Sequence, residues 1–250
     1  MKLLPCRAVN PSKALVLAAG KGTRMGSLTR ELPKPLLPLN GRPILRHVLD
    51  RLRAAGVREI GVVTGYLGDQ VRACLSDYPL PLTFHVQREL NGTARAVLAG
   101  RSFCGTDPFL LTFGDILCAP SAYRGIAHLL EPPAEAVLGV KFAADPAPGA
   151  AVYEENGHVT RIVEKPPPGT STTNWNSAGV YAFTSRIFAE LERVPLSPRG
   201  EYEITSAIAQ LLEANHHVRM YEIKGRWMDV GRPEDLPQAE SLTFDPPDEP

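Results

Sequence analysis

Two glycines and two basic residues stand close together near the beginning of the chain. Gly20, Lys21, Gly22 and Arg24 directly follow the apolar run at residues 14–19. Glycine has no Cβ, so its backbone N–H groups can approach an anion closely, and lysine and arginine supply positive charge. This composition suits phosphate groups, although a lone G-x-G is more often an ordinary turn between a strand and a helix.

The spacing excludes two well-known phosphate loops. The dinucleotide-binding fingerprint needs a third glycine or an alanine three positions after the second glycine, where this chain has Met25. The Walker pattern G-x-x-x-x-G-K-[ST] occurs nowhere in the 250 residues. A triphosphate site on this turn therefore belongs to another type.

Lys34 and Asp115 are further candidates for phosphate chemistry. Lys34 stands between two prolines, which stiffen the backbone and hold its charge in place. Asp115 follows the apolar run at residues 109–113. Ligands of open α/β sheets bind beyond the carboxyl ends of the strands, so this carboxylate is expected to face the site and could bind Mg²⁺. Taken alone, Lys34 is more simply a surface lysine, and Asp115 is as readily a turn residue or a helix cap.

The elements that must position these residues alternate between strand and helix in the first half of the chain. Apolar runs predict strands, and apolar residues at helical spacing predict helices between them. The predicted strands are residues 14–19, 59–64, 82–86 and 109–113, and the predicted helices are residues 43–55, 69–75 and 93–101. This order predicts an α/β fold with a Rossmann-like, open, mostly parallel sheet covered by helices on both faces.

The second half of the chain is less regular. Strands are predicted at residues 136–142, 150–154, 158–164 and 178–183, and a helix at residues 204–214. Asn156-Gly157 predicts a hairpin between the second and third of these strands. We expect one domain over residues 1–244, with a nucleotide-binding lobe at about 13–115 and a smaller acceptor-binding lobe at about 116–240. Residues 245–250 are expected to form a disordered tail.

The composition excludes several other classes of protein. Lysine plus arginine and aspartate plus glutamate each total 27, which counts against nucleic acid as a partner. The four cysteines form no C-x-x-C pair, and the six histidines show no metal-ligand spacing. Prolines and charged residues interrupt the N-terminal segment, and residues 14–19 are too short to cross a bilayer. We expect no membrane partner and a cytoplasmic location.

The combination of motifs is more specific than any one of them. LAAGKGTRM, followed shortly by PKPLLPLNGRPIL, resembles the sugar-1-phosphate nucleotidyltransferase family, of the glucose-1-phosphate thymidylyl- or uridylyltransferase type. The resemblance runs from Lys13 to about Glu240 and implies a glycosyltransferase-A-like nucleotidyltransferase fold. It implies an enzyme that joins a nucleoside triphosphate (NTP) to a sugar 1-phosphate and releases pyrophosphate.

The resemblance also implies a nucleotide site. The glycine-rich loop is expected to wrap the triphosphate, with Arg24 holding the phosphates and Lys34 contacting the α-phosphate. In QRELNGTARA, the Gln87 side chain and the Gly92 backbone are expected to meet the base, and an amide suits uracil or thymine, hence UTP or dTTP. The nucleotide-binding set is Ala19, Gly20, Gly22, Thr23, Arg24, Gln87, Gly92, Thr93 and Asp115.

A magnesium site is implied by two acidic residues. Asp229, in GRWMDVGRPED, is similar to the family's second metal ligand, and with Asp115 it is expected to hold Mg²⁺ against the α-phosphate. The family usually follows the first aspartate with Asn or another acid, whereas this chain has Ile116. The catalytic residues are then Arg24, Lys34, Asp115 and Asp229.

The acceptor side is implied by motifs of the second half. IVEKP resembles the family's E-K-P motif, so Glu164 is expected to accept hydrogen bonds from sugar hydroxyls and Lys165 to bind the sugar phosphate. NSAGVY resembles an acceptor-binding strand, with Asn176 as a hydroxyl ligand and Gly179 as a position of close approach. Gly149 is expected to contact the sugar, although Pro148 replaces the family's aromatic residue before it.

Two alternative functions remain at this stage. VTGYLGDQ, residues 63–70, is similar to a segment of cytidylyltransferases that act on phosphocholine or inositol phosphate. A non-catalytic homologue that binds nucleotide sugars and regulates a partner is the second alternative. The E-K-P and NSAGVY motifs favour a sugar, and the complete set of charged residues favours catalysis. The sequence leaves open the base, the sugar, the pathway, allosteric regulation and whether the chain forms a homo-oligomer.

Overall fold

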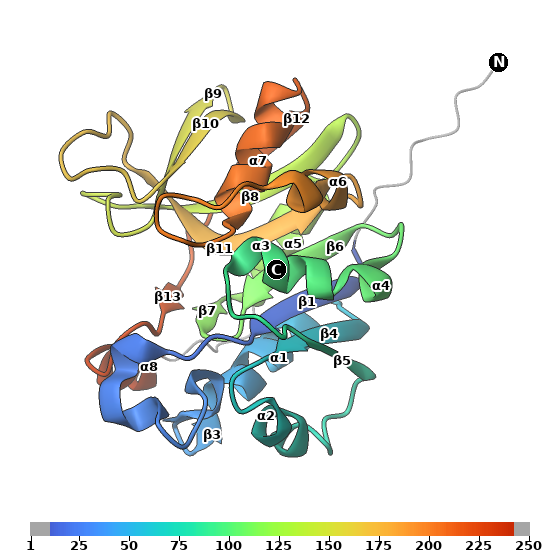
Figure 1. The fold of residues 1–250 in the computed structure, drawn as a ribbon, viewed down its shortest axis with the longest axis vertical. Helices are drawn as coiled ribbons and strands as arrows, with labels where there is room; N and C mark the ends of the chain where they lie inside the picture. Colours follow the sequence, from blue (N-terminus) through green and yellow to red (C-terminus); the bar gives the residue numbers. More distant parts are fainter. Residues whose placement is uncertain (1–10, 243–250) are drawn as a thin grey trace.

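One nine-stranded sheet runs through the molecule (Figure 1). The computed structural model describes residues 11–242, so the predicted tail at 245–250 lies outside the described residues. The strand order is β5-β4-β1-β6-β11-β8-β12-β10-β9. The strands are β1 (Lys13–Ala18), β4 (Glu59–Thr64), β5 (Leu82–Val86), β6 (Phe109–Phe113), β8 (Ala134–Phe142), β9 (Ala150–Glu155), β10 (His158–Glu164), β11 (Trp175–Phe183) and β12 (His217–Glu222).

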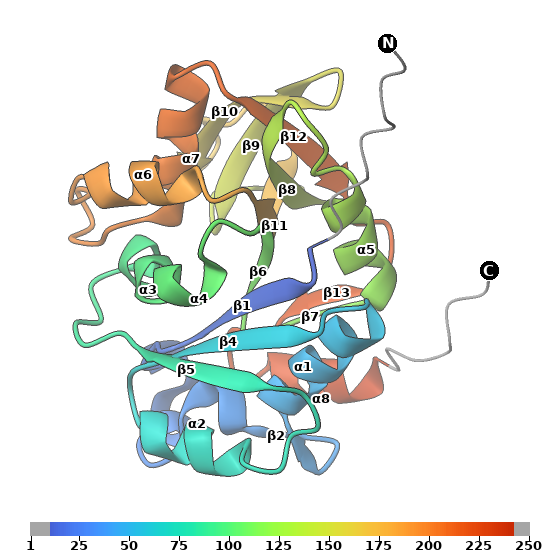
Figure 2. The same ribbon diagram turned by 90° about the vertical axis from the view of Figure 1, so that its right-hand side faces the viewer.

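The N-terminal half of the sheet is parallel, as the strand–helix alternation predicts. β5, β4, β1 and β6 pair in parallel register. Figure 2 shows α1 (Ile44–Ala54) and α2 (Gly68–Cys74) on one side of these strands, and α3 (Thr93–Ala99) and α4 (Arg101–Cys104) on the other. Successive side chains of a strand point to opposite faces, and β1 is apolar after Lys13, so it contributes to a core on each side of the sheet.

The C-terminal half of the sheet is mostly antiparallel. β11 pairs antiparallel with β6 and β8, β10 pairs antiparallel with β9 and β12, and only β12 and β8 are parallel among these neighbours. The expected α/β fold is confirmed, but the sheet is mixed. The hairpin at Asn156-Gly157 is present, with φ of 53° and 79°, and a two-residue connection can join only antiparallel strands. The helices of this half are α5 (Pro120–His128), α6 (Ile187–Arg193) and α7 (Ile204–Glu213).

Several short elements complete the fold, and the strands and 3₁₀ helices among them escaped the sequence prediction. β7 (Ile116–Cys118) pairs antiparallel with β13 (Trp227–Asp229), and β2 (Pro38–Leu39) pairs with β3 (Arg42–Pro43). Two 3₁₀ helices, η1 (Thr23–Thr29) and η2 (Lys34–Leu36), follow the glycine-rich turn, and α8 (Asp235–Ser241) follows β13. Elements of two or three residues have too little length to show a periodic pattern.

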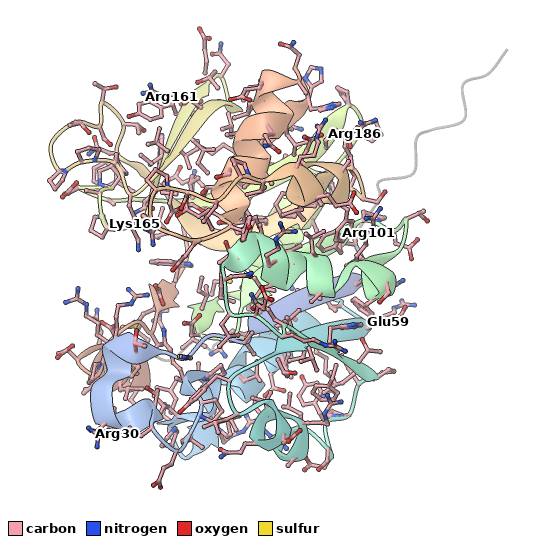
Figure 3. All side chains as sticks on the ribbon, in the orientation of Figure 1. Arg30, Glu59, Arg101, Arg161, Lys165 and Arg186 are labelled. Atoms are coloured by element: carbon pink, nitrogen blue, oxygen red, sulfur yellow. The ribbon has the colours of Figure 1, made fainter. Side chains whose placement is uncertain are left out.

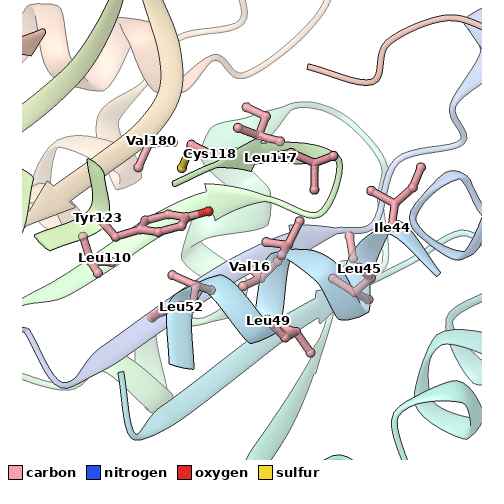
Figure 4. Close-up of a cluster of buried hydrophobic side chains, with 14 of the residues drawn as sticks. Val16, Ile44, Leu45, Leu49, Leu52, Leu110, Leu117, Cys118, Tyr123 and Val180 are labelled. Carbon is pink, nitrogen blue, oxygen red and sulfur yellow. The ribbon is translucent and has the colours of Figure 1, made fainter. Parts of the chain in front are cut away.

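The packing of α1 holds one face of the sheet in place. Leu45, Leu49 and Leu52 point from α1 toward Val16 of β1 in a cluster that also contains Tyr123 (Figure 4). These side chains are fully buried, and truncating such a leucine to alanine typically costs about 2–5 kcal/mol. Within residues 11–242, no helix combines the length and the apolar character needed to cross a bilayer.

Candidate active site

A cleft of about 450 Å³ opens beyond the carboxyl ends of β1 and β6. Every residue that the sequence predicts for the nucleotide contributes to its lining, and so does Lys34. The lining includes Ala19, Gly20, Gly22, Thr23, Arg24, Lys34, Gln87, Gly92, Thr93 and Asp115. This is the edge at which open α/β sheets bind their ligands.

Gly22 lets the glycine-rich turn pack against Lys34. Its φ is +63°, and a Cβ at this position would lie 2.8 Å from the Cβ of Lys34. The hydroxyl of Thr29 donates a hydrogen bond of 3.0 Å to the carbonyl of Gly22 and so fixes the turn. Lys34 is only 6% exposed, so it is a buried lysine held in place between the two prolines and is not a surface lysine.

The side chain of Lys34 lies between the two predicted metal ligands. Its Nζ forms an ion pair with the carboxylate of Asp115 and lies 3.9 Å from Oδ1 of Asp229. The pairing of β7 with β13 brings the aspartates together, because it places Asp229 opposite Ile116. The N–H of Val230 donates a 3.0 Å hydrogen bond to the carbonyl of Asp115, which ties the chain next to Asp229 to the chain at Asp115.

Electrostatics at this point favour a bound cation. The pKa of Asp229 is raised to about 6, chiefly by burial and then by the negative charge of Asp115, while the positive charges of Lys34 and Arg24 oppose the rise. Two carboxylates that repel each other next to a phosphate site are typical oxygen ligands for Mg²⁺, which takes one or two carboxylates together with substrate phosphates and water. Among residues 11–242 there is no group of three or more His, Cys, Asp and Glu side chains that could hold a metal alone.

The end of the cleft that is predicted to read the base is built from Gln87 and Gly92. The Nε2 of Gln87 donates a 3.0 Å hydrogen bond to the carbonyl of Gly92, and its backbone N–H donates to the carbonyl of Thr64 at 2.8 Å. With its N–H₂ group engaged, the Gln87 amide presents Oε1 as an acceptor. Gln87 is only 8% exposed, so its side chain is a buried part of the cleft wall.

The C-terminal half clamps this segment from the other side. The N–H of Tyr202 donates to the carbonyl of Asn91 at 2.8 Å, and the N–H of Ala94 donates to the carbonyl of Tyr202 at 2.9 Å. Gly92 has a φ of +129°, and a Cβ there would collide with the backbone of Tyr202. The predicted base-reading glycine is therefore also a position where two backbones approach closely.

The E-K-P motif ends β10 beside the 195–203 loop. The Arg199 guanidinium donates hydrogen bonds to Glu164 at 3.1 Å and to Glu203 at 3.0 Å. Burial raises the pKa of Glu164, and the nearby charge of Glu203 adds to the rise. Lys165 has a φ of +39°, rare for a residue with a Cβ, and its N–H donates to the carbonyl of Gly149 at 2.7 Å. Such strain is often kept at functional positions.

Asn176 faces the same corner. A Cβ on Gly149 would collide with its side-chain amide, and its Oδ1 is buried without a hydrogen-bond partner among the described residues. Gly149, Glu164, Lys165 and Asn176 thus lie together where β9 begins, β10 ends and β11 begins, outside the lining of the 450 Å³ cleft. An orphaned buried acceptor is costly and fits a ligand hydroxyl that would donate to it.

Gly179 lies elsewhere. Its φ is +67°, and a Cβ there would collide with the side chain of Ile116. The close approach that the sequence predicts at this position is made to protein side chains, Ile116 and Phe113, below the end of β6.

The 195–203 loop contains the residues that sequence reasoning missed. Glu201 lines the cleft, and Glu203 shares Arg199 with Glu164. The available signal was the run PRGEYE, in which one arginine is followed by two glutamates. Its meaning depends on β10, which only the fold brings beside it.

The fold and the site together define an open α/β protein whose cleft brings together a glycine-rich turn, a buried lysine and two carboxylates. Over residues 13–245 the sequence matches the family model described as "Nucleotidyl transferase". The chain belongs to this nucleotidyl transferase family, which confirms the resemblance seen in its motifs.

Individual relatives agree with this assignment. The chain is 33% identical over 244 residues to the low-salt glycan biosynthesis nucleotidyltransferase Agl11 of Haloferax volcanii, covering 93% of this chain and 66% of that protein. It is 35% identical over 235 residues to the UTP–glucose-1-phosphate uridylyltransferase AglF of the same organism, covering 91% and 95%. A UDP-glucose pyrophosphorylase solved with UDP-glucose has the same fold, with a TM-score of 0.82 at 24% identity over 92% of this chain and 97% of that one. This chain thus spans about two thirds of Agl11 and nearly all of AglF.

Proposed function

We propose that this protein transfers a nucleoside monophosphate from an NTP to a sugar 1-phosphate and releases pyrophosphate. The observation that carries the proposal is the convergence of Lys34, Asp115 and Asp229 at the mouth of the glycine-rich cleft. A phosphate oxygen of the sugar 1-phosphate attacks the α-phosphorus directly, so the enzyme needs no nucleophile of its own. Catalysis then consists of alignment and charge stabilisation.

The cationic side chains have separate tasks in this scheme. The turn at residues 20–24 wraps the triphosphate, and Arg24 binds the β- and γ-phosphates. Lys34 stabilises the negative charge that develops at the α-phosphate, and its burial strengthens that interaction. Asp115 and Asp229 would hold Mg²⁺, which supplies Lewis-acid charge neutralisation at the α-phosphate.

The base is uracil or thymine, hence UTP or dTTP as donor. The Nε2 of Gln87 is engaged by the carbonyl of Gly92, which leaves Oε1 to accept a hydrogen bond from the ring N–H of these bases. Cytosine has an acceptor at the same ring position and would face Oε1 with a lone pair. This argues against the cytidylyltransferase alternative. The name of AglF, a UTP-dependent enzyme, agrees with a uracil base.

The acceptor is a sugar 1-phosphate held by β9, β10 and β11. The Glu164 carboxylate and the orphaned Oδ1 of Asn176 accept hydrogen bonds from sugar hydroxyls. Lys165 binds the sugar phosphate, and its left-handed backbone conformation, fixed by the bond to Gly149, directs the side chain. Nucleotide and acceptor are thus bound by separate halves of the molecule. The lobes at 13–115 and 116–240, a cytoplasmic location and any homo-oligomer stay predictions.

A matrix of triphosphates and sugar 1-phosphates tests this proposal. We expect pyrophosphate release with UTP or dTTP in the presence of Mg²⁺, and none with CTP and phosphocholine. Asp115→Asn, which removes one of the two carboxylates assigned to Mg²⁺, should lose most of this activity. Glu155→Gln, which changes an exposed carboxylate on the β9–β10 hairpin, is its matched control. A folded protein that binds nucleotide sugars but releases no pyrophosphate from any pair would establish the regulatory alternative instead.

A further inference from the structure

A second groove adjoins the cleft and is not used by the mechanism above. It has a volume of about 560 Å³ and lies between η1 and the segment before α8. Residues 24–28 form one wall, and Arg232, Pro233 and Glu234 form the other. Arg24 lines both the groove and the cleft, so the two spaces meet at its side chain.

The chain leads from the metal-binding carboxylate directly into this groove. A Cβ on Gly231 would lie 3.7 Å from Nη1 of Arg24 and 3.7 Å from Oδ1 of Asp229. Arg232 is the next residue. The turn is fixed, because Oδ2 of Asp235 accepts hydrogen bonds of 2.7 Å from the N–H groups of both Gly231 and Arg232. Arg232 therefore has a rigid backbone and an exposed side chain beside Arg24.

The groove lies on the side of the site that the leaving group requires. In phosphoryl-type transfer the attacking and leaving oxygens are roughly in line through the phosphorus. The proposed acceptor residue Lys165 lies in the upper half of the molecule, and Arg30, which directly follows η1, lies in the lower half (Figure 3). An acceptor that attacks from β9, β10 and β11 drives pyrophosphate toward η1 and the segment before α8.

We propose that Arg232, together with Arg24, binds the departing pyrophosphate in this groove. This inference rests on the function proposed above. Pyrophosphate carries several negative charges, and the planar guanidinium of arginine matches phosphate oxygens in paired hydrogen bonds. Glu234 lines the same groove and opposes the bound charge, which favours release over retention.

Pyrophosphorolysis, the reverse reaction, tests the assignment because pyrophosphate is then a substrate. For Arg232→Gln we expect the KM for pyrophosphate to rise about 10- to 100-fold, the loss typical of a hydrogen bond between charged groups. The KM for the nucleoside diphosphate sugar should change less than about 2-fold, since the residues proposed to bind its base and sugar do not line the groove. Arg232→Lys should recover part of the loss, and Glu234→Gln should lower the KM for pyrophosphate.

Arg30→Gln is the matched control, an exposed arginine beside η1 that does not line the groove. Calorimetric titration of each protein with magnesium pyrophosphate gives a second readout that needs no turnover. An equal KM for pyrophosphate in Arg232→Gln and Arg30→Gln, or an equal rise in both substrates' KM values, would overturn the inference. Failure of the parent function has a different signature, because the unmodified protein would then cleave no nucleotide sugar at any pyrophosphate concentration.

Discussion

Replacing Asp229 by asparagine should stabilise the protein at neutral pH while it abolishes most of the activity. The pKa of Asp229 rises from 3.8 in the unfolded chain to about 6 in the folded one. The folded protein therefore binds this proton more tightly, and ionising the carboxylate costs folding free energy. That cost is absent below about pH 4, grows as the pH rises toward 6 and is complete above it.

The size of the effect follows from the pKa and from the exposure of the side chain. Each pKa unit corresponds to about 1.4 kcal/mol, so full transfer of the rise would give about 3 kcal/mol. The Asp229 side chain is 42% exposed, and solvent screening reduces this to roughly 1 kcal/mol. For a domain of this size, 1 kcal/mol corresponds to about 2–4 °C in Tm. Loss of one metal-binding carboxylate should lower turnover by about 10²- to 10³-fold.

The assay is thermal unfolding of Asp229→Asn and the unmodified protein with EDTA at pH 7.5 and at pH 4, beside pyrophosphate release with Mg²⁺. We expect the variant to have the higher Tm at pH 7.5 and the two Tm values to converge at pH 4. Glu155→Gln should show neither effect. A lower Tm for the variant at pH 7.5, or near-normal turnover, would refute the reasoning that these carboxylates are held together for a cation.

Three further predictions concern the metal, the base-reading segment and the acceptor. Asp229 must lose its proton to bind Mg²⁺, so the Mg²⁺ concentration needed for half-maximal activity should rise as the pH falls from 7 to 5 through its pKa of about 6. Saturating Mg²⁺ should restore the rate. A Mg²⁺ requirement that does not vary with pH would contradict this prediction. Gly92→Ala introduces a Cβ that collides with the Tyr202 backbone at a φ of +129°. It should therefore lower the free energy of unfolding in urea by about 1–3 kcal/mol and raise the KM for the NTP. Unchanged values of both would show that the packing of Tyr202 against this segment is unimportant. Arg199→Ala leaves the Glu164 carboxylate without its arginine partner. The KM for the sugar 1-phosphate should then rise by about 10-fold, with little change in the KM for the NTP. Equal changes in both KM values would indicate a general loss of structure.

Local patterns in the sequence predicted the N-terminal half of the fold closely. The predicted strands at 59–64, 82–86 and 109–113 coincide with β4, β5 and β6. Their alternation with predicted helices also indicated the parallel order. In the C-terminal half of the sheet the strands other than β12 were recognised, but their pairing was not, apart from the β9–β10 hairpin. A strand's apolar pattern does not identify the neighbour that it will pair with.

In the candidate site, too, local features could be predicted from the sequence and contacts between distant residues could not. The glycine-rich turn is contiguous, so residue types and spacing alone indicated a phosphate site there. The position of Lys34 behind Gly22 and the bond between Gln87 and Gly92 needed coordinates, because both depend on side-chain direction. Arg199 had no recognisable role until β10 was placed beside the 195–203 loop.

By itself, the sequence determined which chemical groups the protein possesses and which short segments present them: a glycine-rich turn suited to phosphate, a lysine fixed by prolines and an aspartate after an apolar run. The tertiary structure alone decided that Asp115 and Asp229 meet at Lys34. That meeting depends on β7 and β13, three residues each, which lie far apart in the sequence and pair in the folded protein. Segments so short have no stability or pattern of their own, and the free energy that brings them together comes from the packing of the whole fold.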